Sequence, residues 1–334
     1  MSEIQHWFSA AHEQFKPSSL LEQAVEAERA GFDAIACSDH FQPWWEPGES
    51  GMAWVWLGSV AQATQRVPVG TAVTPPIGGR YHPALVAQAW ATLEDMYPGR
   101  TFIGAGSGES LNESPLGMDW PDVGEQIERL EEALEIIKRL FDGERLDTFG
   151  HFPMKQAYLH TNPGRRPPIY VSAFGEQAAG VAARHGDGLW TLADPETVPD
   201  LIDAYKSAAE DAGREPGKII LQAGFSWAED DDAAIEGAKP FKATMPDEFY
   251  SDDWHDPKAM AEHADEEFSD EEFRDQFILG SNPDEHVEQI REIEQLGADV
   301  VVLMNYSGAD PLGAVRVYGE KVLPALKGAR VSSA

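Results

Sequence analysis

Short apolar runs alternate with segments of helical period along the whole chain. The runs are rich in β-branched and aromatic residues and are bounded by polar or turn residues, a pattern that predicts buried strands. Eight strands are expected, at residues 5–9, 34–37, 67–73, 101–105, 168–173, 188–192, 219–223 and 300–304. Between them, apolar positions three and four residues apart predict amphipathic helices at residues 19–30, 83–95, 124–141, 198–212, 284–296 and 311–326.

Eight strands separated by helices argue for a parallel (β/α)8 barrel, the TIM-barrel fold. A doubly wound parallel sheet is the alternative, because it has the same alternation of elements. Two segments are longer than a simple connection. Residues 142–166 predict a loop or hairpin before the fifth strand, and residues 225–279, between strands seven and eight, predict helices inserted over the barrel mouth. We expect residues 1–334 to form a single domain.

The charge balance of the chain is extremely acidic. Its 334 residues include 25 Lys and Arg against 58 Asp and Glu, which gives a formal net charge of −33, and the acids are spread along the whole chain. This pattern is typical of a surface that stays hydrated in concentrated salt, where charges are screened. We therefore expect a salt-adapted protein whose surface disfavours nucleic acids and anionic membranes as partners.

The single cysteine, Cys37, excludes an intramolecular disulfide and a cysteine-rich metal site. The first residues show no basic region followed by an apolar stretch, so no secretory signal is predicted. No window of about 18 apolar residues is long enough to span a bilayer. These features together predict a soluble, cytoplasmic location.

Polar and titratable side chains follow the predicted strands at the ends where barrel enzymes gather their reactive groups. The first strand leads into Glu13, the second into His40 and Trp44, and the fourth into Glu109. A histidine titrates near neutrality and can take a hydroxyl proton, and a carboxyl group in an aromatic pocket can have a raised pKa. We expect the three titratable groups to converge at the barrel mouth, with Trp44 as a wall beside them. Such a set can accept and donate protons during hydride transfer. A buried, purely structural histidine is the alternative.

The loop after the fourth strand departs from a dinucleotide fingerprint. Gly104 and Gly106 fit the first two glycines of G-x-G-x-x-G, but Glu109 occupies the third position. We interpret the loop as a tight passage along a flat ligand, with Glu109 directed at it. No histidine pair with zinc-ligand spacing lies near these loops, so no metal is expected. The remaining histidines of acidic segments, such as His286, are expected to face solvent.

Together these loops resemble the coenzyme-F420-dependent glucose-6-phosphate dehydrogenase family, within the bacterial-luciferase-like superfamily. The resemblance is carried by residues 11–15 (Ala-His-Glu-Gln-Phe), 38–44 (Ser-Asp-His-Phe-Gln-Pro-Trp), 80–83 (Arg-Tyr-His-Pro), 97–100 (Tyr-Pro-Gly-Arg) and 106–113 (Gly-Ser-Gly-Glu-Ser-Leu-Asn-Glu). It implies a luciferase-like TIM barrel, an F420-dependent dehydrogenase acting on a CH–OH group, the cofactor F420 at the barrel mouth, and a homodimer.

The resemblance also assigns roles to individual residues. By similarity, His40 is the base that removes the substrate hydroxyl proton, Glu13 supports it, Trp44 shields the reacting complex, and Glu109 protonates or hydrogen-bonds a ring nitrogen of the deazaflavin. The residues implied to line the cofactor are Asp39, Ala72, Val73, Ser107, Gly108, Asn112, Ala173, Phe174 and Gly175. The Ala72–Val73 peptide is implied to be cis, and Gly175 is implied to let backbone amides approach the F420 phosphate at a helix start.

The substrate is where the chain departs from that family. The sugar-phosphate enzymes hold their phosphate with two lysines and an arginine, which align here near Asp194, Glu262 and Gln276. A phosphate at these positions would meet repulsion instead of charge-assisted hydrogen bonds, unless Lys258 or Arg274 takes over the role.

A neutral secondary alcohol is therefore the expected substrate, with an unphosphorylated sugar second, beside a wall of Trp44, Trp45 and Trp190. Two alternatives stay open: an F420-dependent glucose-6-phosphate dehydrogenase, and an FMN-dependent luciferase-like monooxygenase.

Overall fold

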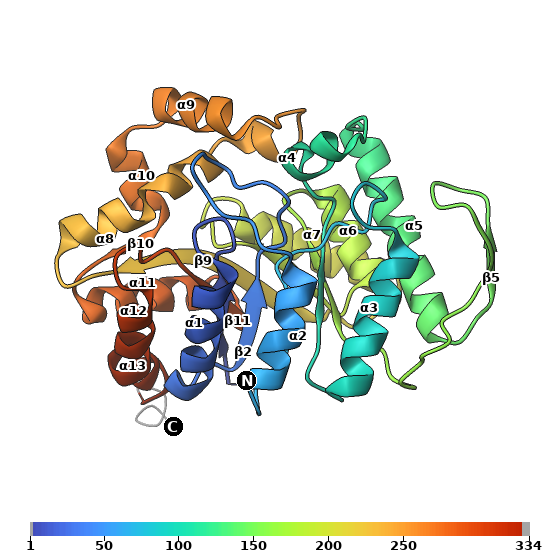
Figure 1. Ribbon diagram of the computed structural model, residues 1–334, viewed down its shortest axis with the longest axis horizontal. Coiled ribbons are helices and arrows are strands. Elements are labelled where there is room, and N and C mark those ends of the chain that lie inside the picture. Colours follow the sequence, from blue (N-terminus) through green and yellow to red (C-terminus); the bar gives the residue numbers. More distant parts are fainter. Residues whose placement is uncertain (1–2, 329–334) are drawn as a thin grey trace.

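A closed barrel of parallel strands forms the centre of the computed structural model, which describes residues 3–328 (Figure 1). The strands follow the order β3-β2-β1-β11-β9-β8-β7-β4. Parallel bridges from Val69 to Thr101 and from Thr74 to Ala105 join β3 to β4 and close the ring. The strands are β1 (Gln5–Ala10), β2 (Ala34–Cys37), β3 (Val69–Thr71), β4 (Ile103–Ala105), β7 (Ile169–Ser172), β8 (Gly188–Leu192), β9 (Lys218–Trp227) and β11 (Val300–Asn305). The predicted (β/α)8 barrel is confirmed, and closure excludes the doubly wound sheet.

Large aromatic side chains fill the interior of the barrel. The ring of Trp7 on β1 lies 4.9 Å from that of Phe102 and 6.0 Å from that of Trp190, measured between centroids. The indole N–H of Trp190 donates to Gln222 Oε1 at 3.1 Å. Trp190 therefore belongs to the barrel filling and does not stand beside Trp44 and Trp45, which pack in a different apolar cluster. The expectation that it forms part of the same wall was wrong.

Helices cover the outside of the barrel, and their termini carry the residues that favour helix starts and stops. Pro17, Pro83 and Pro283 occupy first-turn positions, and Gly31 ends the first helix with a φ of +99°, a conformation that favours glycine. The outer helices are α1 (Pro17–Ala30), α2 (Ala53–Ala63), α3 (Pro83–Met96), α5 (Val123–Phe141), α6 (Glu176–His185), α7 (Val198–Asp211), α11 (Pro283–Gln295) and α12 (Pro311–Val317). A π-helical turn (Tyr318–Val322) continues α12 into α13 (Leu323–Gly328).

Residues 231–280, called the cap from here on, lie across the end of the barrel where the strands finish (Figure 1). The first residues of the expected insertion, 225–227, continue β9 instead of entering the cap. The cap contains α8 (Asp231–Ala238), 3-10 turns at Lys239–Thr244 and Asp247–Tyr250, α9 (Pro257–Glu267), α10 (Asp270–Gln276) and β10 (Ile278–Gly280), which pairs with β9.

An apolar cluster joins the cap to the barrel. The ring of Trp45, in the loop after β2, packs against Phe241 of the cap with a centroid separation of 4.8 Å. Phe241 in turn stacks on Tyr306, which follows β11, at 3.5 Å. Phe249, Met260 and Phe273 complete the cluster from the cap side. The burial of these side chains fixes the cap over the mouth.

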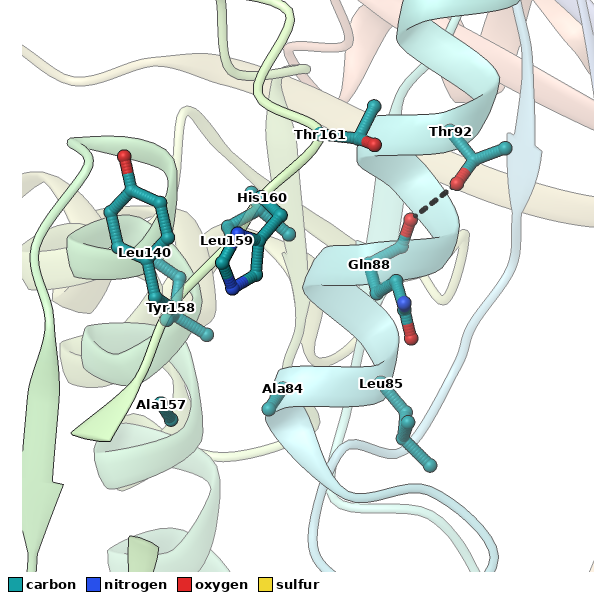
Figure 2. Close-up of a pocket in the computed structure, with 10 residues that line it drawn as sticks. All are labelled: Ala84, Leu85, Gln88, Thr92, Leu140, Ala157, Tyr158, Leu159, His160 and Thr161. Atoms are coloured by element: carbon teal, nitrogen blue, oxygen red, sulfur yellow. Dashed lines mark hydrogen bonds between the residues drawn. The ribbon is translucent and has the colours of Figure 1, made fainter. Parts of the chain in front are cut away.

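Residues 142–166 include the hairpin of β5 (Leu146–Thr148) and β6 (Met154–Ala157). A groove of about 310 Å³ runs between α3 and the segment that follows this hairpin (Figure 2). Its walls are Ala84, Leu85, Gln88, Thr92, Leu140, Ala157, Tyr158, Leu159, His160 and Thr161. None of the residues expected to form the functional site lines this groove.

Within residues 3–328, no helix has the length and apolar character needed to cross a membrane.

Candidate active site

His40 and Glu13 face each other where β2 and β1 end. The distance from His40 Nε2 to Glu13 Oε1 is 3.4 Å, and the other Glu13 oxygen accepts the Ser38 hydroxyl at 2.6 Å. Burial raises the pKa of Glu13 to about 7, against the opposing effect of the Ser38 hydrogen bond. Burial and the positive charge of Arg80 lower the pKa of His40 to about 3. At neutral pH His40 is therefore uncharged, while Glu13 gains or loses its proton in that range.

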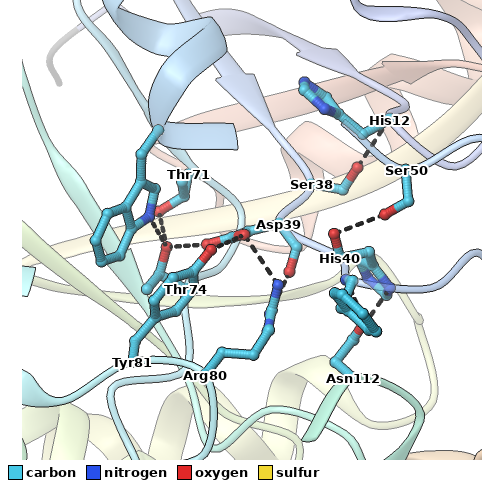
Figure 3. Close-up of polar contacts among 12 residues, drawn as sticks. His12, Ser38, Asp39, His40, Ser50, Thr71, Thr74, Arg80, Tyr81 and Asn112 are labelled. Atoms are coloured by element: carbon cyan, nitrogen blue, oxygen red, sulfur yellow. Dashed lines mark hydrogen bonds and ion pairs between the residues drawn. The ribbon is translucent and has the colours of Figure 1, made fainter. Parts of the chain in front are cut away.

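Asn112 and Glu109 bring the loop after β4 to the same place. Asn112, on α4 (Ser110–Glu113), has a fully buried side chain whose Nδ2 lies 3.1 Å from His40 Nδ1 (Figure 3). The same nitrogen donates to Glu109 Oε2 at 3.1 Å. Burial raises the pKa of Glu109 to about 7, and the Asn112 hydrogen bond opposes the shift. The three titratable residues expected at one mouth thus lie in one chain of contacts, Glu109–Asn112–His40–Glu13.

Asp39 points away from His40 and toward the loop after β3 (Figure 3). Its carboxylate accepts the hydroxyl of Thr74 at 2.6 Å and that of Tyr81 at 3.0 Å. The guanidinium of Arg80 bonds the same carboxylate at 3.2 Å and that of Glu113 at 3.0 Å. Both carboxylate oxygens of Asp39 are therefore engaged by the protein, and its position anchors the loop that carries His40.

The loops after β3 and β4 approach each other closely. The Ala72–Val73 peptide is cis, at the position that the resemblance implied. A Cβ on Gly106 would lie 2.7 Å from Val73 Cγ2, and one on Gly108, whose φ is +75°, would lie 2.7 Å from Pro75. Only glycine fits this approach without displacing a neighbour. The backbone between Gly106 and Glu109 thus passes beside the cis peptide, and Ser107 and Gly108 remain partly exposed.

An aromatic wall stands beside His40. The ring of Trp44 lies 5.4 Å from that of His40 and 5.3 Å from that of Tyr250, which belongs to the cap. Tyr250 also lies 5.3 Å from Phe174, and its hydroxyl donates to the Thr244 carbonyl at 2.8 Å. Tyr250 was missed at the sequence level. Its position in the sequence could have indicated it, because Tyr250 is an aromatic residue in the segment that was expected to cover the mouth.

The loop after β7 presents groups that suit an anionic, flat ligand. Ala173 is buried, but Phe174 is 54% exposed, unusual for an aromatic ring. Gly175 is the N-cap of α6, where no described side chain takes up the first-turn amides, and a Cβ there would meet open space. Unpaired amides at a helix start bind anions such as phosphate. These features are compatible with a ring against Phe174 and a phosphate at the start of α6.

The positions aligned with the missing phosphate-binding cations carry no positive charge. Asp194 accepts the Thr197 hydroxyl at 2.7 Å. Lys258 is 71% exposed and pairs with Glu262 on its own helix at 3.9 Å. Arg274 lines a groove of about 220 Å³ between α8 and α10, whose other walls are Asp232, Ile235, Glu236, Lys239, Asp270 and Phe273. That groove includes none of the mouth residues described above.

His286 is not solvent-facing, as the acidic composition of its segment had suggested. It is fully buried, with Nδ1 2.8 Å from the Tyr318 hydroxyl and Nε2 3.2 Å from the Gly280 carbonyl. Its helix α11 buries it beside Val287, Ile290 and Ile293. The position of His286 on the buried face of α11 therefore determines its burial, and the acidic residues near it in the sequence do not.

Comparison with known proteins places this chain in a family. The chain matches the model of the luciferase-like monooxygenase family over residues 2–300. The chain belongs to the luciferase-like family. Within it, the chain is 38% identical over 330 residues to an F420-dependent glucose-6-phosphate dehydrogenase of Microbacterium testaceum, a match that covers 96% of each protein. This similarity confirms the resemblance to the F420-dependent glucose-6-phosphate dehydrogenase family that the loop residues indicated.

Other members of the luciferase-like family differ in substrate. An F420-dependent hydroxymycolic acid dehydrogenase of Mycobacterium tuberculosis is 36% identical over 320 residues, which cover 95% of this chain and 87% of that protein. A solved F420-dependent secondary alcohol dehydrogenase, in complex with an F420-acetone adduct, superposes with a TM-score of 0.92 at 32% identity and covers 97% of this chain and 99% of its own.

Proposed function

We propose that this protein is an F420-dependent dehydrogenase that transfers a hydride between a hydroxyl-bearing substrate carbon and C5 of the deazaflavin. The observation that carries the proposal is the chain of contacts from Glu109 through Asn112 and His40 to Glu13, next to the Trp44 ring. The named activities of the similar proteins support it, since they are F420-dependent dehydrogenases of glucose-6-phosphate, hydroxymycolic acid and secondary alcohols.

The residues proposed to hold F420 come from four loops, those after β2, β3, β4 and β7. Ala72 and Val73 at the cis peptide, Ser107 and Gly108, and the Phe174–Gly175 start of α6 form partly open walls around the mouth. Asp39, Asn112 and Ala173 are buried residues of the same group of loops. When bound, F420 supplies a deazaflavin that accepts or donates hydride. The neighbouring Glu109 places a carboxyl group with a pKa of about 7 at the same wall, suited to hold or release a proton at a ring nitrogen.

We assign the substrate hydroxyl proton to the His40–Glu13 pair. Glu13 has a pKa of about 7, near the value at which a proton acceptor works best in neutral solution. Trp44 lies beside His40 and packs against Tyr250 of the cap, and the side chains of His40 and Glu13 are only 10% and 2% exposed to water. Exclusion of water strengthens the hydrogen bonds that His40 makes at the reacting centre.

We further propose a neutral substrate, with a secondary alcohol first and an unphosphorylated sugar second. The aromatic wall of Trp44 and Tyr250 supports a small, weakly polar molecule. The neutral or acidic residues at Asp194, Glu262 and Gln276 support the exclusion of a phosphate. Glucose-6-phosphate remains the competing substrate, because it is the substrate named for the relative from Microbacterium testaceum.

Two measurements test the function. Titration of the purified protein with F420 and with FMN should give tight binding of F420 only, and tight FMN binding without F420 affinity would support a monooxygenase instead. A screen of F420 reduction by alcohols, free sugars and sugar phosphates in high salt should then be led by secondary alcohols. Glucose-6-phosphate as the best substrate by a wide margin would refute the neutral-substrate proposal.

We also propose a cytoplasmic homodimer adapted to salt. Exposed apolar side chains on two adjacent outer helices support a protein interface there: Val55 of α2 is 69% exposed, and Leu85 and Met96 of α3 are 53% and 58% exposed. Light scattering after size-exclusion chromatography in molar potassium chloride should give twice the mass of the 36.7 kDa chain.

A further inference from the structure

The orientation of the Asn112 side-chain amide is fixed by the backbone of the loop after β2. Its Oδ1 accepts the amide N–H of Phe41 at 2.7 Å and that of Gln42 at 3.3 Å. Rotating the amide of the buried Asn112 by 180° would set its NH₂ group against these two donors and remove the acceptor that both N–H groups have here. The Nδ2 atom of Asn112 must therefore face the opposite direction, toward His40 and Glu109.

This orientation determines which nitrogen of His40 carries hydrogen. The Nδ2 group has two hydrogens and accepts none, so both partners at 3.1 Å, His40 Nδ1 and Glu109 Oε2, must be acceptors. A neutral imidazole has one N–H. With Nδ1 accepting, that hydrogen is on Nε2, which lies 3.4 Å from Glu13 Oε1.

We propose that Asn112 is a positioning residue that holds His40 in the tautomer with hydrogen on Nε2. His40 then meets a substrate oxygen as a hydrogen-bond donor, and the lone pairs available in the His40–Glu13 pair lie on Glu13. This catalytic consequence rests on the proposed function, whereas the tautomer itself is a property of the protein without cofactor. It changes the role that the family resemblance gave to His40, because an imidazole with hydrogen on Nε2 and with Nδ1 bonded to Asn112 has no free lone pair to remove the substrate proton.

The test is nitrogen-15 NMR of the whole protein labelled at histidine, recorded without cofactor above pH 8. His40 is identified by the signal lost in His40→Gln. In the unaltered protein its hydrogen should be on Nε2. In Asn112→Asp, a carboxylate oxygen can accept the Phe41 and Gln42 amides while the second faces Nδ1, so Nδ1 should gain hydrogen. Ser50→Ala is the matched control, because it removes the 2.7 Å hydrogen bond to the His40 backbone carbonyl and leaves the contacts of both ring nitrogens in place.

Hydrogen on Nδ1 in the unaltered protein would overturn the proposal, and this measurement requires only that His40→Gln, which supplies the assignment, folds. An Asn112→Asp protein with hydrogen still only on Nε2 would overturn it as well. With an alcohol substrate, Asn112→Asp should lose at least about 10²-fold in turnover, as expected when a histidine that acts in proton transfer is held in the wrong tautomer. A protein with the expected tautomers but no F420-dependent activity would refute the proposed function and leave the assignment of Asn112 intact.

Discussion

The guanidinium of Arg80 joins Asp39, at the end of β2, to Glu113, on α4, with distances of 3.2 Å and 3.0 Å. All three side chains are almost fully buried. This ion pair fixes the two loops that carry His40 and Asn112 relative to each other. The geometry of the mouth therefore depends on a cation that does not contact the His40–Glu13 pair.

Removal of that cation should destabilise the protein strongly. Arg80→Ala would leave Asp39 and Glu113 as buried charges without the cation that pairs with both, which costs about 3–5 kcal/mol in the free energy of unfolding. Urea denaturation of the full chain measures the loss. Arg139→Ala, which removes an exposed arginine paired with Glu135 and Glu144, is the control and should change stability by less than about 1 kcal/mol. Equal effects of the two variants would contradict the role assigned to Arg80.

His40→Ala should lower turnover by about 10²–10⁴-fold, the usual contribution of a group that handles a proton in the reaction. F420 affinity should change little, because the His40 ring contacts Trp44, Asn112 and Glu13 within the protein. Steady-state kinetics and a fluorescence titration with F420 separate the two quantities. A parallel loss of affinity and turnover would identify His40 as a structural residue.

Glu109→Gln should slow cofactor reduction with all substrates by a similar factor. Its carboxyl group lies at the wall proposed for the deazaflavin, so its loss affects a step that every substrate shares. Single-turnover reduction of F420 by two alcohols of different size measures the effect. A loss confined to one alcohol would place Glu109 at the substrate instead of the cofactor.

The raised pKa values of Glu13 and Glu109 predict a pH dependence of stability. Each carboxyl group has a usual pKa of 4.5 when exposed and one of about 7 in the folded protein. The folded state therefore binds more protons than the unfolded state between these values, and stability falls as pH rises through this window. Glu13→Gln and Glu109→Gln should each raise the melting temperature at pH 8. Glu196→Gln, at an exposed position, controls for the change in net charge and should leave it nearly unaltered.

Stability should also rise with salt concentration. The 58 acidic residues repel one another when unscreened, and ions shorten the range of that repulsion to about 3 Å at 1 M. The melting temperature should increase from dilute buffer to molar potassium chloride. An unchanged melting temperature across that range would refute salt adaptation.

The pattern of apolar and polar residues predicted the eight barrel strands, because each strand is a short apolar run bounded by polar residues. It did not single out α2 or α6. The first, with the sequence Ala-Trp-Val-Trp-Leu-Gly-Ser-Val-Ala-Gln-Ala, is apolar on most sides, and the second is short and rich in alanine. The first lacks the two-faced pattern that marks an amphipathic helix, and the second offers only ten residues in which such a pattern can be recognised.

The candidate site was predictable where it depends on strand ends. Glu13, His40 and Glu109 all follow strands of the barrel, so its topology alone brings them to one mouth. The contact of Tyr250 with Trp44 and the filling role of Trp190 depend on tertiary packing between distant segments. The spacing of apolar residues along the sequence carries no information about such contacts.

The cap is one continuous segment, whereas every group in the chain of contacts from Glu13 to Glu109 comes from the first 120 residues of the sequence. Hydrogen bonds from Trp120 to the Ser251 carbonyl and from Gln42 to the His255 carbonyl, at 2.8 Å and 3.0 Å, fasten the cap to that part; Ser110 also donates to Asp253. Because the cap and the chain of contacts come from separate parts of the sequence, the cap can change in evolution while the residues from Glu13 to Glu109 are kept. The similar proteins are named for different substrates: glucose-6-phosphate, hydroxymycolic acid and a secondary alcohol.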